Sequence, residues 1–300
     1  MLDLHIHTNA SDGAHSPEEI VQLVKQKGLY CFAIADHNSI GSLKRAWELA
    51  EEEGLNFLPA VEFDTFYKEL DLHLLAYGID FANPSCSQWM EEIFEAKIRQ
   101  TKKRVEKLKA LGFKIDFDTL MKIAGNKQPT GGDYVRALSQ DPEGRNDPRV
   151  RAYIDGERSN SPYLNFYLDW LKAGRPAFVP FEEMEITKVI KRAKALGAVL
   201  VLAHPSDTPE EYVEELAQEG LDGLEVYTSY HSSELAEKWL KIAQRLGLIP
   251  TAGSDFHGKK VKPDVELGIE CAFEKEMVEK LVQRISQRSG KFIFQVRVGE

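Results

Sequence analysis

Short apolar runs alternate with longer amphipathic segments over residues 1–80 and again from residue 184 onward. Apolar runs of this kind are typical of strands buried on both faces, and the amphipathic segments have the spacing of surface helices. The alternation indicates an α/β fold with a mostly parallel sheet. The predicted strands are residues 2–6, 30–35, 57–61, 72–77, 199–203, 224–227, 249–252 and 292–298.

The first predicted helix carries signals at both of its ends. Ser16 is a typical N-cap, Pro17 fits the first helical position, and Glu19 completes a capping box. Gly28 is expected to end the helix. Further helices are predicted over residues 40–53, 186–196 and 233–246.

The alternation stops after Pro84. A long amphipathic helix is predicted over residues 87–111, and a turn-rich region and a helix over 163–172 follow it. We therefore predict two units. Residues 1–85 and 181–300 form a discontinuous α/β domain, and residues 86–180 form an inserted, largely helical subdomain that covers the mouth of the site.

Composition narrows the class of protein. The net charge of −10 argues against a nucleic-acid-coating surface, although residues 86–180 hold 17 Lys and Arg against 13 Asp and Glu. The three cysteines have no C-x-x-C spacing, which argues against a disulfide framework and a thiolate zinc site. Without a signal-peptide pattern or a bilayer-spanning apolar run, we expect a soluble cytoplasmic protein with no membrane contact and no stable nucleic-acid complex.

Six of the eight histidines belong to a set of nine side chains that can bind metal. Nearly all of them follow a predicted strand, and in parallel α/β barrels the loops after the strands meet at one end, so we expect these residues to converge. His73 differs because it lies inside its strand. The set is His5, His7, Asp12, His37, Glu62, His73, His204, Asp255 and His257.

Imidazole and carboxylate ligands without thiolate suit Zn, Mn or Fe. One ion takes about four to six ligands, so nine candidates indicate two or three divalent ions that share carboxylates. Such clusters stabilise the attacking and leaving oxygens of phosphoryl transfer and lower the pKa of a bound water to about 7. The pattern therefore predicts a metal-dependent hydrolase.

The order of these motifs resembles that of the PHP (polymerase and histidinol phosphatase) family along essentially the whole chain. The helical insertion after the fourth strand is similar to the branch of stand-alone phosphoesterases that act on nucleoside 3′,5′-bisphosphates and short RNA 5′ ends. The motifs that carry the resemblance are Asp3-Leu4-His5-Ile6-His7-Thr8, Ala10-Ser11-Asp12-Gly13, Ala33-Ile34-Ala35-Asp36-His37-Asn38, Val61-Glu62, His73, Leu202-Ala203-His204-Pro205 and Gly253-Ser254-Asp255-Phe256-His257.

The resemblance implies a distorted (β/α)7 barrel, a trinuclear metal site and attack on phosphorus by a metal-bridging hydroxide. It assigns one ion to His5, His7, Glu62 and Asp255, a second to Glu62, His73 and His204, and a third to Asp12, His37 and His257. Asp12 stands where some relatives have histidine, which favours harder ions such as Mn²⁺.

The resemblance is weaker in the residues expected to contact substrate. Related phosphoesterases carry an Arg-x-His triplet where this chain has Gly131-Gly132-Asp133, so contact with a second phosphate is expected to be weaker. Arg136, Arg175 and His231 are the predicted substrate-binding residues, and Asp255 and His231 the predicted catalytic ones. The run Lys102-Lys103-Arg104 is typical of a solvated helix face.

The leading hypothesis is a phosphoesterase that hydrolyses a small phosphate monoester, such as a nucleoside 3′,5′-bisphosphate. One alternative is a 5′→3′ exonuclease on short RNA or DNA ends, which predicts laddered products and strong salt dependence. Histidinol phosphate hydrolysis is a third option, which the insertion does not favour. A non-catalytic metal or phosphate sensor is a fourth, but a silent relative is expected to lack ligands, and this chain keeps all nine.

Overall fold

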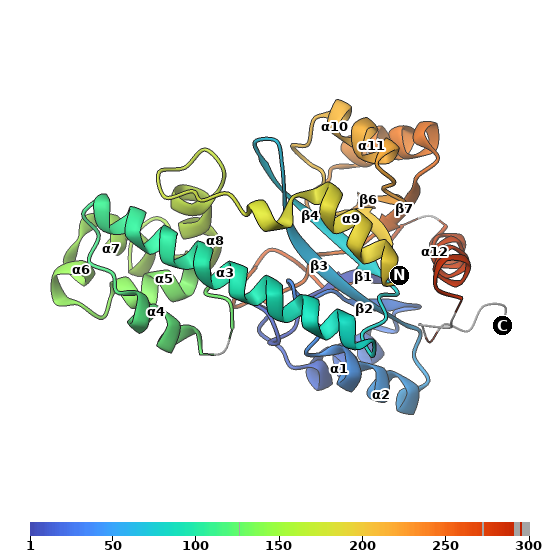
Figure 1. Ribbon diagram of the computed structural model, residues 1–300. Helices are drawn as coiled ribbons and strands as arrows, with labels where there is room; N and C mark the ends of the chain where they lie inside the picture. Colours follow the sequence, from blue (N-terminus) through green and yellow to red (C-terminus); the bar gives the residue numbers. More distant parts are fainter. Residues whose placement is uncertain (126, 272, 291–294, 296–300) are drawn as a thin grey trace.

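The computed structural model describes residues 1–125, 127–271, 273–290 and residue 295. Its centre is one seven-stranded sheet whose strands lie in the order in which they follow along the chain (Figure 1). The predicted α/β class and mostly parallel sheet are confirmed. The strands are β1 (Asp3–Ile6), β2 (Phe32–Ile34), β3 (Phe57–Tyr67), β4 (Leu70–Tyr77), β5 (Val199–Leu202), β6 (Gly223–Tyr227) and β7 (Ile249–Ala252).

Strand β4 runs antiparallel to both of its neighbours, β3 and β5. Only Lys68 and Glu69 separate β3 from β4, and a connection this short joins antiparallel strands, whereas a parallel pair needs a long crossover. The beginning of β4 therefore lies at the same edge of the sheet as the ends of the parallel strands. This reversal explains why His73 lies within a strand while most other predicted ligands follow one.

The strands β1 and β7 form the two edges of the sheet and do not pair with each other, so the predicted barrel is not confirmed. The chain leaves the strand conformation after β7, and in the described residues two isolated bridges, Ile6 with Phe256 and Leu2 with Ile269, join the β1 edge to the segment after β7. The last predicted strand, 292–298, lies outside the described residues apart from Gln295, which pairs with Phe57 in an isolated antiparallel bridge.

Helices flank the sheet, and alternate residues of its strands pack on two separate cores. Phe57 and Val61 of β3 contact the core shared with α1, α2, α9, α10 and α11, whereas Leu58 and Ala60 contact the core shared with α12. The first helix begins with the predicted Ser16–Glu19 capping box and ends at Gly28. The flanking helices are α1 (Pro17–Lys27), α2 (Leu43–Glu53), α9 (Ile186–Ala195), α10 (Glu210–Gln218), α11 (Ser233–Leu246) and α12 (Glu274–Ser289).

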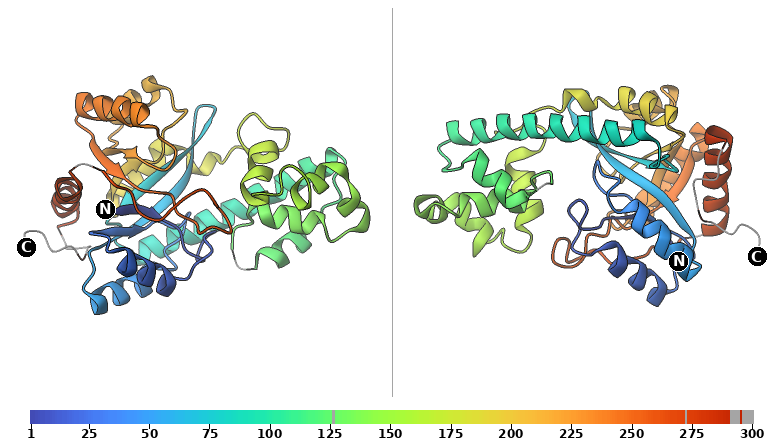
Figure 2. Two further views of the ribbon diagram at one scale, coloured as in Figure 1. Left: turned by 180° about the vertical axis from the view of Figure 1, so that it is seen from behind. Right: turned by 60° about the horizontal axis from the view of Figure 1, so that its bottom comes forward.

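A group of helices stands to one side of the sheet and is joined to it by the long helix α3 (Figures 1 and 2). The group has a core of its own. Trp89 and Ile93 of α3 belong to the core beside the sheet, and Val105 and Leu108 belong to the second core, so the predicted boundary at residue 86 falls inside a helix shared by both. The helices are α3 (Pro84–Ala110), α4 (Phe117–Ala124), α5 (Gly131–Leu138), α6 (Pro142–Asn146), α7 (Pro148–Ile154), α8 (Pro162–Phe166), the π-helical turn η1 (Tyr167–Leu171) and the 3₁₀ turn η2 (Glu182–Met184).

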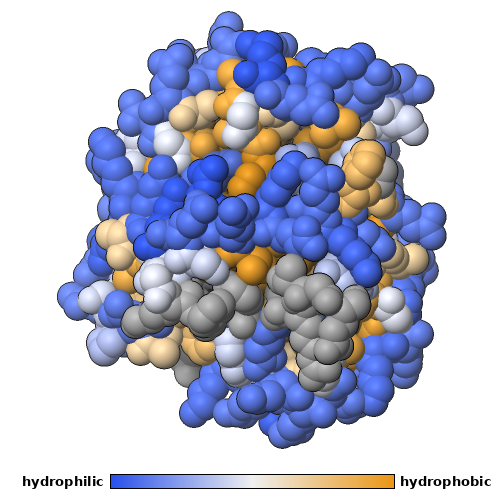
Figure 3. All heavy atoms as spheres, turned by 90° about the vertical axis from the view of Figure 1, so that its right-hand side faces the viewer, coloured by the Kyte–Doolittle hydropathy of each residue, from blue (hydrophilic) through white to orange (hydrophobic). Residues whose placement is uncertain are grey.

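The opposite end of the molecule, near α12, presents a mostly hydrophilic surface with apolar side chains between the polar ones (Figure 3). Among the described helices, none is both long and apolar enough to cross a bilayer.

Gly253, directly after β7, allows the two sheet edges to approach. An added Cβ at this position would lie 2.3 Å from the Cβ of His5 and 2.6 Å from Glu225 Oε1. We expect Gly253→Ala to lower the free energy of unfolding by about 1–3 kcal/mol through overpacking, as measured by denaturant unfolding. Gly132→Ala is the matched control, because its nearest neighbour would be 3.7 Å away. Equal stability of the two variants would contradict the close approach.

Asp222, which precedes β6, ties α12 to the sheet. It accepts hydrogen bonds from Arg284 Nη1 at 3.0 Å, Arg288 Nη2 at 2.7 Å and Leu200 N at 3.0 Å. Burial alone raises the pKa of Asp222, but the bonds from Arg288 and from the backbone of Leu200 hold it below its ordinary value of 3.8. A carboxylate with a lowered pKa stabilises the fold above that ordinary value and loses the effect as the pH falls through the folded-state pKa.

We therefore expect Asp222→Asn to lower the free energy of unfolding at pH 7 by about 2 kcal/mol. The difference from the unsubstituted protein should shrink progressively below about pH 4 in a series of urea unfolding curves. A difference that is constant from pH 7 to pH 3 would show that the charge of Asp222 does not act in this way.

Candidate metal centre

The nine predicted ligands meet at the edge of the sheet where the parallel strands end. His5 lies in β1, Glu62 in β3 and His73 in the first half of β4. His204 and Asp255 follow β5 and β7 with positive φ angles of 25° and 60°, which non-glycine residues rarely adopt. Strained backbone of this kind is concentrated at functional sites, where the surrounding structure maintains it.

Strand β3 shows how the sheet directs polar side chains to this edge. Leu58 and Ala60 face the core shared with α12, so Glu62 and Asp64, two and four residues further along, face the same side. Val61 and Phe63 face the opposite core. The same face is thus apolar in the middle of the sheet and carries carboxylates at its end.

Glu62 is the centre of the cluster. It is fully buried, and its Oε2 atom lies 3.1 Å from His5 Nε2 and 3.0 Å from His7 Nε2. Its Oε1 atom lies 3.0 Å from His73 Nδ1 and 3.3 Å from His204 Nε2. Both oxygens of one carboxylate therefore face pairs of imidazoles, as expected of a carboxylate shared between cations.

Two further carboxylates complete the cluster. Asp255 Oδ1 lies 3.2 Å from His7 Nε2 and 3.3 Å from His257 Nδ1. Asp12 Oδ1 lies 3.3 Å from His257 Nε2, and Asp12 Oδ2 lies 3.6 Å from His37 Nε2. Asp12 thus belongs to the cluster although it comes from a loop.

The hydrogen bonds of the cluster fit a site for cations better than a packed polar core. His5 Nε2 and His7 Nε2 face each other at 3.1 Å, and both rings are fully buried. Buried polar atoms are normally hydrogen-bonded, yet several here are buried without a hydrogen bond. These atoms are His7 Nδ1, Glu62 Oε2 and His257 Nε2. Cations between the facing donor atoms would satisfy them.

Three overlapping groups have ligand atoms within 4.8 Å of one another in the described residues: His5, His7, Glu62 and Asp255; His7, Asp12, His37 and His257; and His37, Glu62 and His73. The first group is the set predicted for the first ion. The second adds His7 to the predicted set for the third ion. The third contains His37 in place of His204, which lies beside Glu62.

The charges of the cluster stabilise one another. Burial alone raises the pKa of Glu62, but His5 and His37 hold it well below its ordinary value. Burial alone lowers the pKa of His5, but Glu62 and Glu225 raise it to about 10. Metal ions bind the deprotonated imidazole and so compete with protons for these nitrogens.

Residues outside the predicted set hold the ligands in place. His5 Nδ1 lies 3.0 Å from Glu225 Oε1, and Glu225 Oε2 accepts a hydrogen bond of 2.8 Å from the backbone N of His204. His37 Nδ1 lies 2.8 Å from Asp64 Oδ1. Partners of this kind fix the orientation of a metal-binding imidazole. Sequence analysis missed both, although a lone carboxylate within an apolar strand, as at Glu225, was a usable signal.

Two buried aspartates hold the ligand-bearing loops. Asp36 accepts hydrogen bonds from Thr8 N at 2.7 Å and Ser11 Oγ at 2.7 Å, which orders the loop before Asp12. Asp3 accepts a bond of 2.9 Å from Ser254 N, next to Asp255. Burial raises the pKa of Asp3 to about 6.

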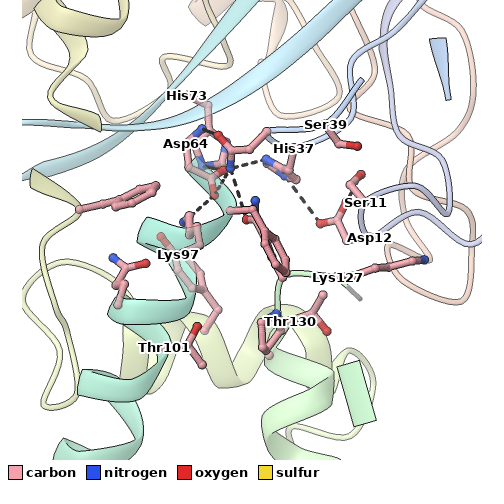
Figure 4. A pocket seen from close by; sticks show the side chains of 18 of the residues that line it. Ser11, Asp12, His37, Ser39, Asp64, His73, Lys97, Thr101, Lys127 and Thr130 are labelled. Atoms are coloured by element: carbon pink, nitrogen blue, oxygen red, sulfur yellow. Dashed lines mark hydrogen bonds and ion pairs between the residues drawn. The ribbon is translucent and has the colours of Figure 1, made fainter. Parts of the chain in front are cut away.

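A cavity of about 700 Å³ opens beside the cluster, between the sheet edge and helices α3, α5 and α8. Figure 4 shows Asp12, His37, Asp64 and His73 on one wall and Lys97 and Thr101 of α3 across from them. The cavity is large enough for a small organic ligand.

Comparison with known protein families agrees with a cluster of metal ligands at the sheet edge. The PHP domain model matches residues 3–154. The chain belongs to the PHP family.

Relatives of this PHP protein act on phosphate esters. It is 26% identical over 262 residues to the 3′,5′-nucleoside bisphosphate phosphatase of Chromobacterium violaceum, with 85% of this chain and 87% of the relative aligned. It is 25% identical to the 5′-3′ exoribonuclease of Haemophilus influenzae, over 85% of this chain and 89% of the relative. The prediction of a metal-dependent phosphoric ester hydrolase is confirmed at the level of reaction class.

A solved structure extends the likeness to the helical part. The crystal structure of a metal-dependent phosphoesterase from Bifidobacterium adolescentis superposes with a TM-score of 0.73 at 30% identity, covering 94% of this chain and 96% of that one. The helices of residues 84–171 are therefore largely included in the match.

The predicted substrate-contacting residues of this PHP protein do not line the cavity beside the cluster. Arg136 pairs with Asp133 on the surface of α5, because Asp133 caps that helix and turns the pair outward. Arg175 is exposed in a turn. His231 lines a second cavity of about 560 Å³, and its Nδ1 lies 2.8 Å from the carbonyl oxygen of Val226. None of the three therefore faces the cavity beside the cluster, and their predicted roles remain predictions.

Removal of ligands should release metal from this PHP protein. We expect His5→Ala combined with His7→Ala to lose bound ions, because both rings face Glu62, and Glu225→Gln to weaken metal affinity about 10- to 100-fold by freeing the ring of His5. Metal content after dialysis, measured by inductively coupled plasma mass spectrometry, checks both. His231→Ala is the control and should retain its ions. Equal metal content in all variants would contradict the assignment.

Proposed function

We propose that this PHP protein hydrolyses a small phosphate monoester, and that the substrate is a nucleotide such as a nucleoside 3′,5′-bisphosphate. The observation that carries the proposal is the cluster of shared carboxylates and imidazoles, which opens on a cavity of about 700 Å³. A metal cluster on a cavity of this size suits a small organic phosphate.

Two or three divalent ions, Mn, Zn or Fe, would be held by the nine ligands and would activate water and stabilise charge on the phosphoryl oxygens. The protein's own contribution is to hold the ligands rigidly. Glu225 orients His5, and Asp64 orients His37. No side-chain nucleophile is required in this scheme, and Asp255 acts as a ligand at the reacting centre.

Two lysines bring positive charge to the same place. Lys97 Nζ lies 2.7 Å from Asp64 Oδ2 and 4.4 Å from the ring centre of Phe181. Lys262 Nζ contacts Asp255 and lies 3.0 Å from the hydroxyl of Tyr230. Both line the cavity, so they can attract a phosphate toward the cluster and stabilise its charge.

The helical part, residues 86–180, serves in this proposal as a cover over the site. The Tyr163 hydroxyl from α8 donates a hydrogen bond to Asp12, and Lys127 Nζ donates one to the carbonyl oxygen of Asn9. These contacts join the helices to the loop that carries a predicted metal ligand. A cover of this kind excludes water from a reacting phosphate.

A 5′→3′ exonuclease on short oligonucleotides is the second candidate. The Haemophilus influenzae relative carries that activity in its name, and the helical part has an excess of basic residues. Both candidates use the same cluster and differ in the length of the substrate.

The activity is tested with metal-free protein supplied in turn with Mn²⁺, Zn²⁺, Co²⁺ or Fe²⁺. We expect release of phosphate from p-nitrophenyl phosphate and from adenosine 3′,5′-bisphosphate with at least one ion, measured colorimetrically, because the cluster supplies the charge that the reaction needs. The His5→Ala, His7→Ala double variant is the control and should be inactive. Absence of product with every ion would refute the proposal.

The same preparation separates the two candidates. A mononucleotide substrate should show a shallow dependence of rate on salt, whereas guidance of a strand by basic residues makes binding fall steeply with salt. We expect adenosine 3′,5′-bisphosphate to be cleaved at a rate that changes little between 50 and about 200 mM salt. Laddered products from a 5′-phosphorylated oligonucleotide, with a steep salt dependence, would favour the exonuclease.

A further inference from the structure

Arg104 differs from the two lysines that precede it. Lys102 and Lys103 are exposed, whereas Arg104 is half-buried and lines the cavity beside the metal cluster. It lies seven residues after Lys97, so the two side chains project from the same face of α3. Gln100 and Thr101 lie between them on that face and also line the cavity. The basic run 102–104 is therefore solvated only in part.

Arg104 has no carboxylate partner in the part of the chain that the structure describes. Its Nε atom is buried without a hydrogen bond, and its guanidinium lies beside the hydroxyl of Tyr134. Asp71 lines the same cavity, but its Oδ2 atom is already bound by the Tyr167 hydroxyl at 3.0 Å and by the backbone N of Ala173 at 2.9 Å.

The other cations of the cavity already have partners. Lys97 is paired with Asp64, Lys262 with Asp255, and Lys127 with the carbonyl oxygen of Asn9. Gln100 adds an acceptor, since its Nε2 bonds Val179 O at 2.7 Å while its Oε1 is buried without a hydrogen bond. Arg104 is thus a cation that still has donors available to a ligand, and a guanidinium binds phosphate through paired N–H groups.

Arg104 lies further from the metal cluster than Lys97 does. Lys97 contacts Asp64, which contacts His37 in the metal cluster. Seven residues of α-helix rise about 10 Å, so Arg104 leaves α3 about 10 Å further from the cluster. One phosphate at the cluster is therefore too far away to satisfy Arg104. Phe94, Tyr167 and Phe181 line the cavity and offer apolar surface to the part of a ligand between the two ends.

We propose that Arg104 binds a second phosphate of the substrate while the first phosphate reacts at the metal cluster. This inference rests on the proposed function and specifies its substrate class: a nucleotide with two phosphates, either both on one nucleoside or on neighbouring nucleotides. Gln100 accepts a hydrogen bond from a sugar or base group between the phosphates.

Equilibrium binding tests the inference without turnover. The metal-free protein is titrated by calorimetry with adenosine 3′,5′-bisphosphate, with the 5′-phosphorylated dinucleotide pApA, and with 5′-AMP. Arg104→Met should weaken binding of at least one doubly phosphorylated ligand about tenfold or more, and binding of 5′-AMP by less than about twofold. Lys103→Met is the matched control, because it removes one positive charge from the same turn of α3 on its exposed side.

Selective loss with adenosine 3′,5′-bisphosphate supports the inference and places both phosphates on one nucleoside. Selective loss with pApA supports it and places the second phosphate on the next nucleotide. An equal loss with 5′-AMP, an equal effect of Lys103→Met, or no loss with either ligand overturns it. Arg104→Lys, which keeps the charge without the paired donors, should recover part of the affinity, and circular dichroism confirms that each variant is folded.

Kinetics with Mn²⁺ separate a failure of this inference from a failure of the proposed function. Arg104→Met should raise the KM for the doubly phosphorylated substrate about tenfold and leave kcat/KM for p-nitrophenyl phosphate unchanged, because that ester has one phosphate. If Arg104→Met reduces hydrolysis of both substrates equally, the role of Arg104 is refuted, but the proposed function is not. If the protein hydrolyses neither substrate, the proposed function is refuted, and the calorimetric binding result still tests the role of Arg104.

Discussion

The buried carboxylate of Glu62 is the interaction on which this site depends. A fully buried carboxylate is costly unless opposite charges surround it. Here the surrounding groups are imidazoles from three other strands or strand ends, His5, His73 and His204 among them. The fold can bury Glu62 only where those segments converge, so the position of the cluster and the arrangement of the sheet are set together.

The reversed strand β4 contributes to the same constraint. In a fully parallel sheet a residue at the start of a strand would lie at the end remote from the site. The tight connection between β3 and β4 brings His73 opposite Asp64 in the register and within 3.0 Å of Glu62. Asp3 and Asp36 then order the loops from the neighbouring segments. A layer of buried carboxylates thus supports the layer of predicted metal ligands.

Much of this arrangement could be predicted from patterns of residues that are close together in the sequence. The capping box of Ser16 and Glu19, and the ligands that follow strands, depend on residues close together in the chain. The direction of β4 was not predicted, because polar residues at Glu62 and Asp64 interrupt the apolar pattern. The predicted strand 57–61 is therefore shorter than β3, and the short connection to β4 was hidden. His231 follows a strand as the ligands do, but position along a strand does not determine which side of the sheet a loop residue faces.

Contacts between distant segments left weaker signals. Tyr163 reaches Asp12 because α8 packs beside the sheet edge, and nothing near Tyr163 in the sequence indicates it. Arg104 stood in a basic run, and its difference from Lys103 is visible only when the face of α3 is known. Such side chains require the packing of whole helices before their roles can be recognised.

Helix α3 is one uninterrupted segment that contributes to two hydrophobic cores. A rigid rod embedded in both units limits how they can move. Any tilt of the helical part would move the far end of α3, yet the axial separation of Lys97 and Arg104 would stay the same. The helix therefore fixes the distance between these two side chains along its axis.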